Sequence, residues 1–150
     1  MRFRVPPPII ALAGALAMGW LDRHAPLLRW LAPPWNRIGL AFIATGFAID
    51  LTAIATFFRE RTTVDPIRIE RSTRLVVSGL YRVSRNPMYL GLLLVLFGFG
   101  LWLGSLTPFL VVVAVERVVV VWQIRSEEAV LGQKFGDAYR EYSRRVRRWL

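Results

Sequence analysis

The chain has 150 residues and a net charge of +10; 55% of its residues are hydrophobic and 20% are charged. This length corresponds to one domain, and a soluble domain of this size has too small a core to bury so many apolar side chains. The lack of cysteine excludes disulfides and thiolate chemistry, and the single histidine argues against a metal site. Because the basic residues flank apolar runs, their layout favours a membrane surface over nucleic acid as the partner.

Four apolar runs are each close to the length of about 20 residues that a membrane-spanning helix needs. We expect spans at about residues 5–21, 38–58, 88–103 and 108–124. Valine is frequent in the last run and would favour a strand in water, but a lone strand in lipid leaves its backbone groups unsatisfied. Only four residues separate the last two runs, which predicts a tight hairpin. The expected fold is therefore all-α, a polytopic membrane protein with four transmembrane helices.

Basic residues predict the orientation of these spans. Seven arginines lie between residues 59 and 86 and seven basic residues lie between residues 125 and 150, whereas the turn at 104–107 has none. Loops rich in arginine stay on the cytoplasmic side of a membrane. This predicts a cytoplasmic loop at 59–87 and both termini in the cytoplasm, and we expect a bacterial inner membrane as the location.

The tail is predicted to form an amphipathic helix over residues 126–142. Apolar residues recur at helical spacing from Leu131 to Tyr142, so this helix is expected at the membrane interface or folded over the bundle. Ser126 is the expected N-cap, and the acidic residues after it suit the positive end of the helix dipole. The polybasic run at 144–148 is expected to meet anionic lipid headgroups.

The segment before the third span has the most unusual composition in the chain. It is long and polar, contains glycines and aromatics, and leads into the span with Asn86 as a candidate N-cap and Pro87 in the first turn. An ordinary basic loop that sets topology and caps a helix is one interpretation. The other is a functional loop, because long loops in compact domains are often functional.

This segment resembles the signature of isoprenylcysteine carboxyl methyltransferases and of their bacterial relatives, the phospholipid methyltransferases. The resemblance rests on Thr63-Val64-Asp65-Pro66 and on the run Gly79-x-Tyr81-x-x-x-Arg85-Asn86-Pro87-x-Tyr89-x-Gly91. Later elements resemble phosphatidylethanolamine methyltransferases or the tail of the family, and they are Gly98-Phe99-Gly100, Glu127-Glu128 and Phe135-Gly136-x-x-Tyr139-x-x-Tyr142-x-x-Arg145-Val146. Together these elements occur in order over roughly residues 60–148.

The resemblance implies S-adenosylmethionine as the cofactor and methyl transfer to a lipid or lipid-like acceptor that enters from the bilayer. It implies catalytic roles for Arg85, Asn86 and Tyr89, and it implies cofactor contacts from Tyr81, Tyr89, Gly91, Gly98, Gly100, Glu127 and Glu128. Carboxylates suit the ammonium or ribose of this cofactor, arginine suits its carboxylate, and a tyrosine ring suits its cation. We expect the loop that ends in Tyr89 to face Glu127 and Glu128, with the tail helix as a lid.

Each of these residue types also has a structural interpretation. Glutamates suit the start of a helix, glycines suit helix packing, and tyrosines suit the interfacial aromatic belt. Asn86 departs from the carboxyl methyltransferases, which have histidine at this place, and asparagine is no base near neutral pH. A carboxylate acceptor needs no base, whereas an amine must first lose a proton, so the class of acceptor stays open between carboxylate, amine and thiol.

Ionisable residues inside the expected spans are further candidates, because charge is costly within a membrane. These are Asp50, Glu116 and Arg117. Asp50 and Arg117 can instead pair with each other between the second and fourth spans. We expect Glu116, Arg145 and Arg148 to contact the acceptor, and a solvated polybasic tail is the alternative for the two arginines at 145 and 148.

Two other classes of function stay open for this sequence. A small membrane reductase of the sterol type shares a related helical end and would use NADPH, but the chain has little room for a dinucleotide. A non-enzymatic lipid-binding or assembly protein is the other class, and it would not require the ordered set of motifs. The oligomeric state does not follow from the sequence.

Overall fold

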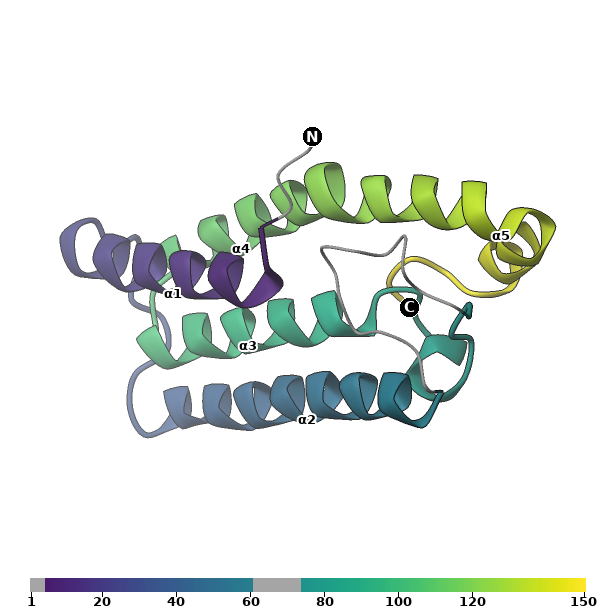
Figure 1. The fold of residues 1–150 in the computed structure, drawn as a ribbon. Helices are drawn as coiled ribbons and strands as arrows, with labels where there is room; N and C mark the ends of the chain where they lie inside the picture. The colour runs from purple at the N-terminus through teal and green to yellow at the C-terminus, as the bar shows by residue number, and fades with distance from the viewer. Residues whose placement is uncertain (1–4, 61–73) are drawn as a thin grey trace.

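The computed structural model describes residues 5–60 and 74–150, and this part of the chain is largely helical. Four helices run side by side along the molecule (Figure 1): α1 (Pro7–His24), α2 (Ile38–Arg59), α3 (Pro87–Leu103) and α4 (Thr107–Val118). The remaining elements are the π-helix η4 (Val119–Ile124), which continues α4 directly into α5 (Arg125–Arg145), and two short 3-10 helices, η1 (Trp35–Arg37) and η3 (Gly79–Arg82). The all-helical prediction is confirmed, and the helices begin and end within a few residues of the expected ranges.

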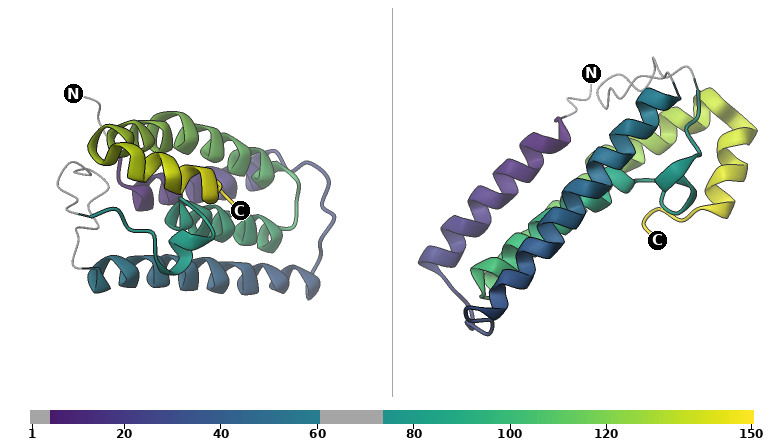
Figure 2. Two further views of the ribbon diagram at one scale, coloured as in Figure 1. Left: turned by 90° about the vertical axis from the view of Figure 1, so that its right-hand side faces the viewer. Right: turned by 90° about the horizontal axis from the view of Figure 1, so that it is seen from below.

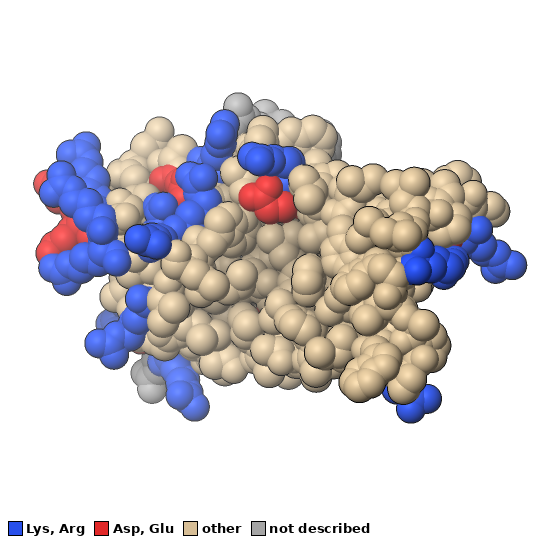
Figure 3. Space-filling model, turned by 180° about the vertical axis from the view of Figure 1, so that it is seen from behind, with Lys and Arg blue, Asp and Glu red and all other residues tan. Residues whose placement is uncertain are grey.

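Two helical stretches are long and apolar enough to cross a membrane, Trp35–Arg59 and Thr107–Arg145, and α3 is apolar but shorter. The expected count of four spans therefore stays a prediction. Most charged side chains in Figure 3 lie toward the ends of the molecule, and a broad uncharged region lies between them. Leu16 and Leu51 are each 67% exposed. An exposed apolar surface of this extent indicates a membrane or a partner protein around the bundle.

The helices α2 and α3 pack closely because glycines line their contact. A Cβ atom built on Gly98 would lie 2.5 Å from the carbonyl oxygen of Gly39, and one built on Gly46 would lie 2.7 Å from the carbonyl oxygen of Gly91. Real Cβ atoms essentially never approach other atoms so closely, so glycine alone fits at these positions without a shift. Small residues let helix backbones approach each other in the same way in membrane proteins.

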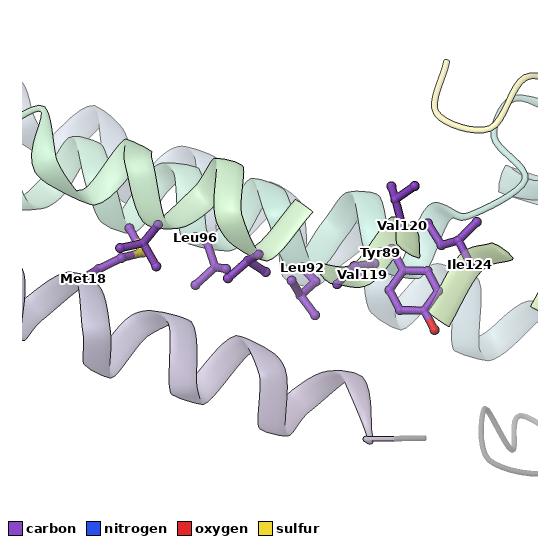
Figure 4. Packing of buried hydrophobic residues seen from close by; sticks show 9 residues of the cluster. Met18, Tyr89, Leu92, Leu96, Val119, Val120 and Ile124 are labelled. Carbon is purple, nitrogen blue, oxygen red and sulfur yellow. The ribbon is translucent and has the colours of Figure 1, made fainter. Parts of the chain in front are cut away.

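The main core lies between α1, α3, α4 and η4. Met18, Leu96, Val119 and Ile124 are at most 1% exposed, and they belong to one buried cluster along the bundle (Figure 4). Tyr89 belongs to the same cluster and is the buried member that carries a hydroxyl group. Its position brings one polar group to the end of an otherwise apolar core.

The hairpin between α3 and α4 is tight, as predicted. Gly104 ends α3 with a φ of 84°, the left-handed conformation that glycine commonly adopts after a helix. The connection between α1 and α2 lies across this turn, because the backbone amides of Trp30 and Leu31 donate to the carbonyl oxygen of Gly104 at 3.0 and 3.2 Å. Thr107 also donates to the carbonyl oxygen of Ala25 at 2.7 Å. These bonds join the helix ends at this side of the bundle.

The tail helix begins at Arg125, one residue before its predicted start, but its predicted N-cap is wrong. Ser126 does not cap a new helix, because α4, η4 and α5 form one unbroken helical stretch in which Ser126 is an internal residue. The chain changes direction instead at Gly136, whose φ of 51° and ψ of −120° lie outside the helical region. The part of α5 after Gly136 turns back, and the C-terminal segment ends beside η3 (Figure 2).

Candidate functional site

The candidate site lies where the start of α3, the start of α5 and the C-terminal segment 146–150 meet. Tyr89, in the first turn of α3, donates a hydrogen bond from its hydroxyl to Oε1 of Glu127 at 2.6 Å. Arg85, just before α3, places Nη1 3.2 Å from Oε1 of Glu128. The fold thus brings together four of the residues that the sequence motifs single out, although Tyr89 and Glu127 are 38 positions apart in the sequence.

Two guanidinium groups hold Glu128. Arg148 donates from Nε and Nη2 to the two carboxylate oxygens of Glu128 at 3.0 and 2.8 Å, the forked geometry that makes such pairs strong. The side chains of Glu128 and Arg85 are 20% and 16% exposed, so water screens their interaction only in part. Hydrogen bonding to Glu128 raises the pKa of Arg148 above its usual value, and Arg148 therefore stays charged near neutral pH.

The C-terminal segment reaches the site through its backbone. The amide of Arg85 donates to the carbonyl oxygen of Arg147 at 3.0 Å, and Nδ2 of Asn86 donates to the carbonyl oxygen of Arg148 at 3.1 Å. The hydroxyl of Ser84 donates to this second oxygen at 3.3 Å. Asn86 occupies the N-cap position of α3, as predicted, but its side chain does not cap the helix because it bonds to Arg148 instead.

Tyr139 and Tyr142, on the returning half of α5, add two phenol groups to the site. Nη1 of Arg85 donates to the hydroxyl of Tyr139 at 3.4 Å, and the hydroxyl of Tyr142 donates to the carbonyl oxygen of Tyr81 at 2.7 Å. Burial raises the pKa of Tyr139 and of Tyr142 above that of an ordinary phenol, so both stay neutral near neutral pH. Neither is among the predicted site residues, although both occur in the tail pattern of the family.

Tyr81 lies at the edge of the site and packs against α2. Its ring centroid is 5.3 Å from that of Phe57, with the two rings nearly perpendicular, which is a favourable arrangement of aromatic quadrupoles. Burial raises the pKa of the Tyr81 phenol. Because Tyr142 bonds to its carbonyl oxygen, Tyr81 anchors η3 to the returning half of α5, and its expected contact with a cofactor stays a prediction.

The glycines predicted to contact a cofactor face neighbouring helices. A Cβ atom on Gly91 would overlap the carboxylate of Asp50, and one on Gly98 would meet the backbone of α2. A Cβ atom on Gly100 would lie 3.3 Å from the ring of Phe109. Helix packing therefore accounts for the small size of all three residues, and their part in cofactor binding stays a prediction.

The alternative interpretation of Asp50 and Arg117 as an ion pair is wrong. The helix α2 packs mainly on α3, and Arg117, whose side chain is 77% exposed, lies 3.5 Å from the carboxylate of the adjacent Glu116 instead. Asp50 is turned toward Gly91, and its Oδ1 atom has no hydrogen-bond partner among the described residues. The sequence could not reveal this arrangement, because it does not state which helices are neighbours.

The three residues expected to contact an acceptor have different surroundings. Arg148 holds Glu128 in the site, whereas Arg145 pairs with Glu141 on the exposed face of α5. Glu116 lies on α4 and pairs with its neighbour in sequence. The motif element at residues 63–66 lies outside the described residues.

This arrangement can bind a molecule that carries both a positive and a negative group. Glu127 offers a carboxylate, and Tyr89 fixes its position. Arg85 offers a guanidinium whose Nε is buried and has no hydrogen-bond partner within the described part of the chain. A buried donor without a partner is costly, so a bound anionic group that accepts from Nε would be favoured here.

Comparisons with known proteins identify the family of the chain. The chain matches the phospholipid methyltransferase family over residues 35–138. Protein-S-isoprenylcysteine O-methyltransferase B of Arabidopsis thaliana is 35% identical over 116 residues, which are 74% of this chain and 56% of the plant protein. The protein-S-isoprenylcysteine O-methyltransferase of Schizosaccharomyces pombe is 24% identical over 120 residues, 80% of this chain and 51% of that protein. The chain therefore spans about half the length of these two relatives.

A shorter relative matches over its whole length. An uncharacterized protein of Haemophilus influenzae is 49% identical over 63 residues, which are 42% of this chain and 100% of that protein.

Proposed function

Because the chain belongs to the phospholipid methyltransferase family, we propose that it transfers a methyl group from S-adenosylmethionine to a lipid or lipid-like acceptor at a membrane. The observation that carries this proposal is the pairing of Tyr89 with Glu127 and of Arg85 with Glu128 at the polar end of an apolar bundle. The names of the plant and S. pombe relatives support the same class of reaction. The family match favours it over a nicotinamide-dependent reductase and over a protein without enzymatic activity.

The residues of the site fit the groups of this cofactor. When bound, S-adenosylmethionine supplies an electrophilic methyl group on a sulfonium, near an ammonium and a carboxylate. In this proposal Glu127, held by Tyr89, accepts a hydrogen bond from the ammonium, and Arg85 donates to the carboxylate through its buried Nε. Hydrogen bonds to charged groups of this kind contribute about 1.5–3 kcal/mol each.

The chain contributes to the reaction mainly by alignment and by excluding water. The neutral phenols of Tyr139 and Tyr142 hold Arg85 and η3 without adding charge to the site. Holding two reactants in the correct geometry lowers a barrier by as much as about 7–11 kcal/mol. Asn86 supplies no base, so an acceptor that is already ionised, such as a carboxylate, reacts most directly at this site.

We further propose that all four helices α1–α4 cross a bacterial inner membrane, with the site and both termini on the cytoplasmic side. Exposed tryptophans support one membrane interface at the far end from the site, and they are Trp20, Trp30, Trp35 and Trp102. Tryptophan is enriched at such interfaces. The basic tail at the opposite end is in the position where anionic headgroups attract arginine.

Cofactor binding gives the first test. S-adenosylhomocysteine at about 100 times its Kd should stabilise the purified protein by about 2.7 kcal/mol and raise its Tm, whereas NADPH should not. Glu127→Gln should remove most of this shift, because it removes the charge that faces the ammonium. The matched control is Glu141→Gln, since Glu141 is an exposed acid on the same helix and its variant should keep the full shift.

Different results would contradict the proposed reaction and the proposed role of Glu127. A shift with NADPH and none with S-adenosylhomocysteine would exclude the methyltransferase function. An equal shift in the two glutamine variants would remove Glu127 from the site. Incubation with labelled methyl donor and a bacterial lipid extract, followed by identification of the labelled product, would then name the class of acceptor.

A further inference from the structure

A groove runs along the bundle between α1 and α4. Small residues shape it, because Ala13, Gly14 and Ala17 on α1 and Ala114 on α4 leave room that larger side chains would fill. Gly14 is buried and forms the floor, since a Cβ atom there would lie 3.1 Å from the side chain of Val115. The groove is therefore built by residues outside the candidate site.

Among the described residues the lining of the groove is apolar, apart from the indole N–H of Trp122 and the side-chain amide of Gln123 in η4. Gln123 is 3% exposed, and its Nε2 donates to the carbonyl oxygen of Val5. Its Oε1 atom is buried and has no hydrogen-bond partner in residues 5–60 and 74–150. A buried acceptor without a donor is costly, and within a membrane no bulk water is at hand to supply one.

Gln123 lies at the end of the groove that is nearest the candidate site. It precedes Glu127 by four residues on one continuous helical stretch, so the two residues are about 6 Å apart along the helix axis. From Val111 to Gln123 the groove follows the helix for about 18 Å, which is the scale of a fatty acyl or prenyl chain. A chain in the groove would therefore deliver its polar end to the neighbourhood of Tyr89 and Glu127.

We propose that this groove holds one hydrocarbon chain of the acceptor lipid and that Oε1 of Gln123 accepts a hydrogen bond from an N–H or O–H group where the chain meets the head. The proposal rests on the methyltransferase function proposed above and defines its acceptor as an amphiphile with a donor at the root of a long chain. An apolar track with one acceptor atom at its inner end is complementary to such a molecule. A partner helix brings no backbone donor to Gln123, because its N–H groups bond within the helix.

Photo-crosslinking of the full chain in lipid nanodiscs tests the occupant of the groove. The probe is phosphatidylethanolamine with a diazirine in one acyl chain, and we expect label on the peptides that contain Ala13, Ala17 and Ala114. Ala114→Phe fills part of the groove, so about two methylene groups of the lipid's acyl chain are no longer buried there. This loss should lower the labelling about tenfold. Val113→Phe is the matched control, since Val113 is exposed and does not line the groove.

Equal labelling of the two phenylalanine variants would overturn the proposal. If Ala114→Phe does not fold to a monodisperse protein, Ala114→Leu replaces it with the same expected direction. A crosslinked dimer in place of lipid label would show that a second copy of the chain occupies the groove, and this outcome would also overturn the proposal.

Two lipids that differ where their chains meet the head test the role of Gln123. Sphingomyelin carries an amide N–H and a hydroxyl where its chains meet the head, and phosphatidylcholine, which has the same head group, carries neither. The unmodified protein should take about five times more label from the first lipid, because one hydrogen bond contributes about that factor in affinity. Gln123→Leu should remove the difference between the two lipids. Equal labelling of the unmodified protein by both lipids would exclude the hydrogen bond to Oε1.

The thermal shift with S-adenosylhomocysteine, measured on the same samples, separates this proposal from the function on which it rests. Ala114→Phe should keep the shift, because Ala114 is not part of the cofactor site. Groove labelling without a thermal shift in the unmodified protein would contradict the methyltransferase function and leave the lipid site standing. A thermal shift without groove labelling would contradict the lipid site alone.

Discussion

Replacing Gly98 with alanine tests the closest approach of two helices in the bundle. A Cβ atom there would lie 2.5 Å from the carbonyl oxygen of Gly39 and 2.8 Å from the amide nitrogen of Ile43. Ordinary contacts begin at 3.4 Å, so α2 and α3 would have to separate by about 0.9 Å, the difference between 3.4 and 2.5 Å. Overpacking of this kind costs about 1–3 kcal/mol, and the upper half of that range applies because backbone atoms cannot rotate away.

The matched control is Gly19→Ala in α1, where a Cβ atom would meet nothing within 4 Å. Alanine in a helix is more stable than glycine by about 0.5–1 kcal/mol, and both variants receive this gain. Gly98→Ala should therefore be about 1–2 kcal/mol less stable than the unmodified protein, while Gly19→Ala should be slightly more stable. For a chain of this length, the difference of about 2–3 kcal/mol between the variants corresponds to about 4–12 °C in Tm.

Thermal unfolding in detergent, followed by circular dichroism, measures this difference. Equal Tm values for the two alanine variants would refute the close contact between α2 and α3. The affinity of the folded protein for S-adenosylhomocysteine, measured in parallel, separates packing from a cofactor role. Packing alone predicts an unchanged affinity in Gly98→Ala, whereas the predicted contact of Gly98 with the cofactor requires a large loss of affinity without a matching loss of stability.

Two further predictions concern the returning helix and the topology. Gly136→Ala places a side chain at a φ of 51°, so the returning half of α5 should loosen and proteases should cut it faster. Gly132→Ala is the control, because the added Cβ atom makes only an ordinary contact of 3.8 Å, and it should not change the rate of cleavage. Because the chain has no cysteine, a single introduced cysteine can show on which side of the membrane its position lies. An impermeant maleimide should label Leu106→Cys from outside intact cells, and it should label Gln133→Cys only after the membrane is opened.

Each of these predictions has a clear contrary result. Equal proteolysis of the two alanine variants would show that the bend at Gly136 does not depend on glycine. Labelling of both cysteines from the same side would contradict four crossings. Both experiments leave the site residues unchanged, so neither result depends on the proposed function.

The helices could be predicted because apolar runs and their interruptions are local features of the sequence. The bounds of α2 and α3 follow from an apolar run between Arg37 and Arg59 and from the Asn86–Pro87 start signal. The unbroken continuation of α4 through η4 into α5 was not predictable in this way. A serine followed by two glutamates at 126–128 has the pattern of a helix start, yet the same residues continue a helix that already began at Thr107.

The site could be predicted in part. Its side chains belong to recognisable motifs, whereas its backbone contacts have no sequence pattern. The approach of Tyr89 to Glu127 was expected from the order of the motif elements. The return of the C-terminal segment was not, because Arg147 and Arg148 accept hydrogen bonds through carbonyl oxygens that every residue possesses. Tyr139 likewise needs the bend at Gly136 before it can reach the site.

The π-helix η4 determines how α5, which carries Glu127 and Glu128, is rotated about the helix axis relative to α4. A π-turn holds one residue more than the α-turn that it replaces, and each residue of an α-helix advances by about 100° around the axis. With one residue fewer in Val119–Ile124, everything after it would be rotated by about that angle relative to α4. Glu127 would then face away from Tyr89, while Val115 kept its place in the core. A single inserted residue thus keeps the carboxylates in phase with the bundle.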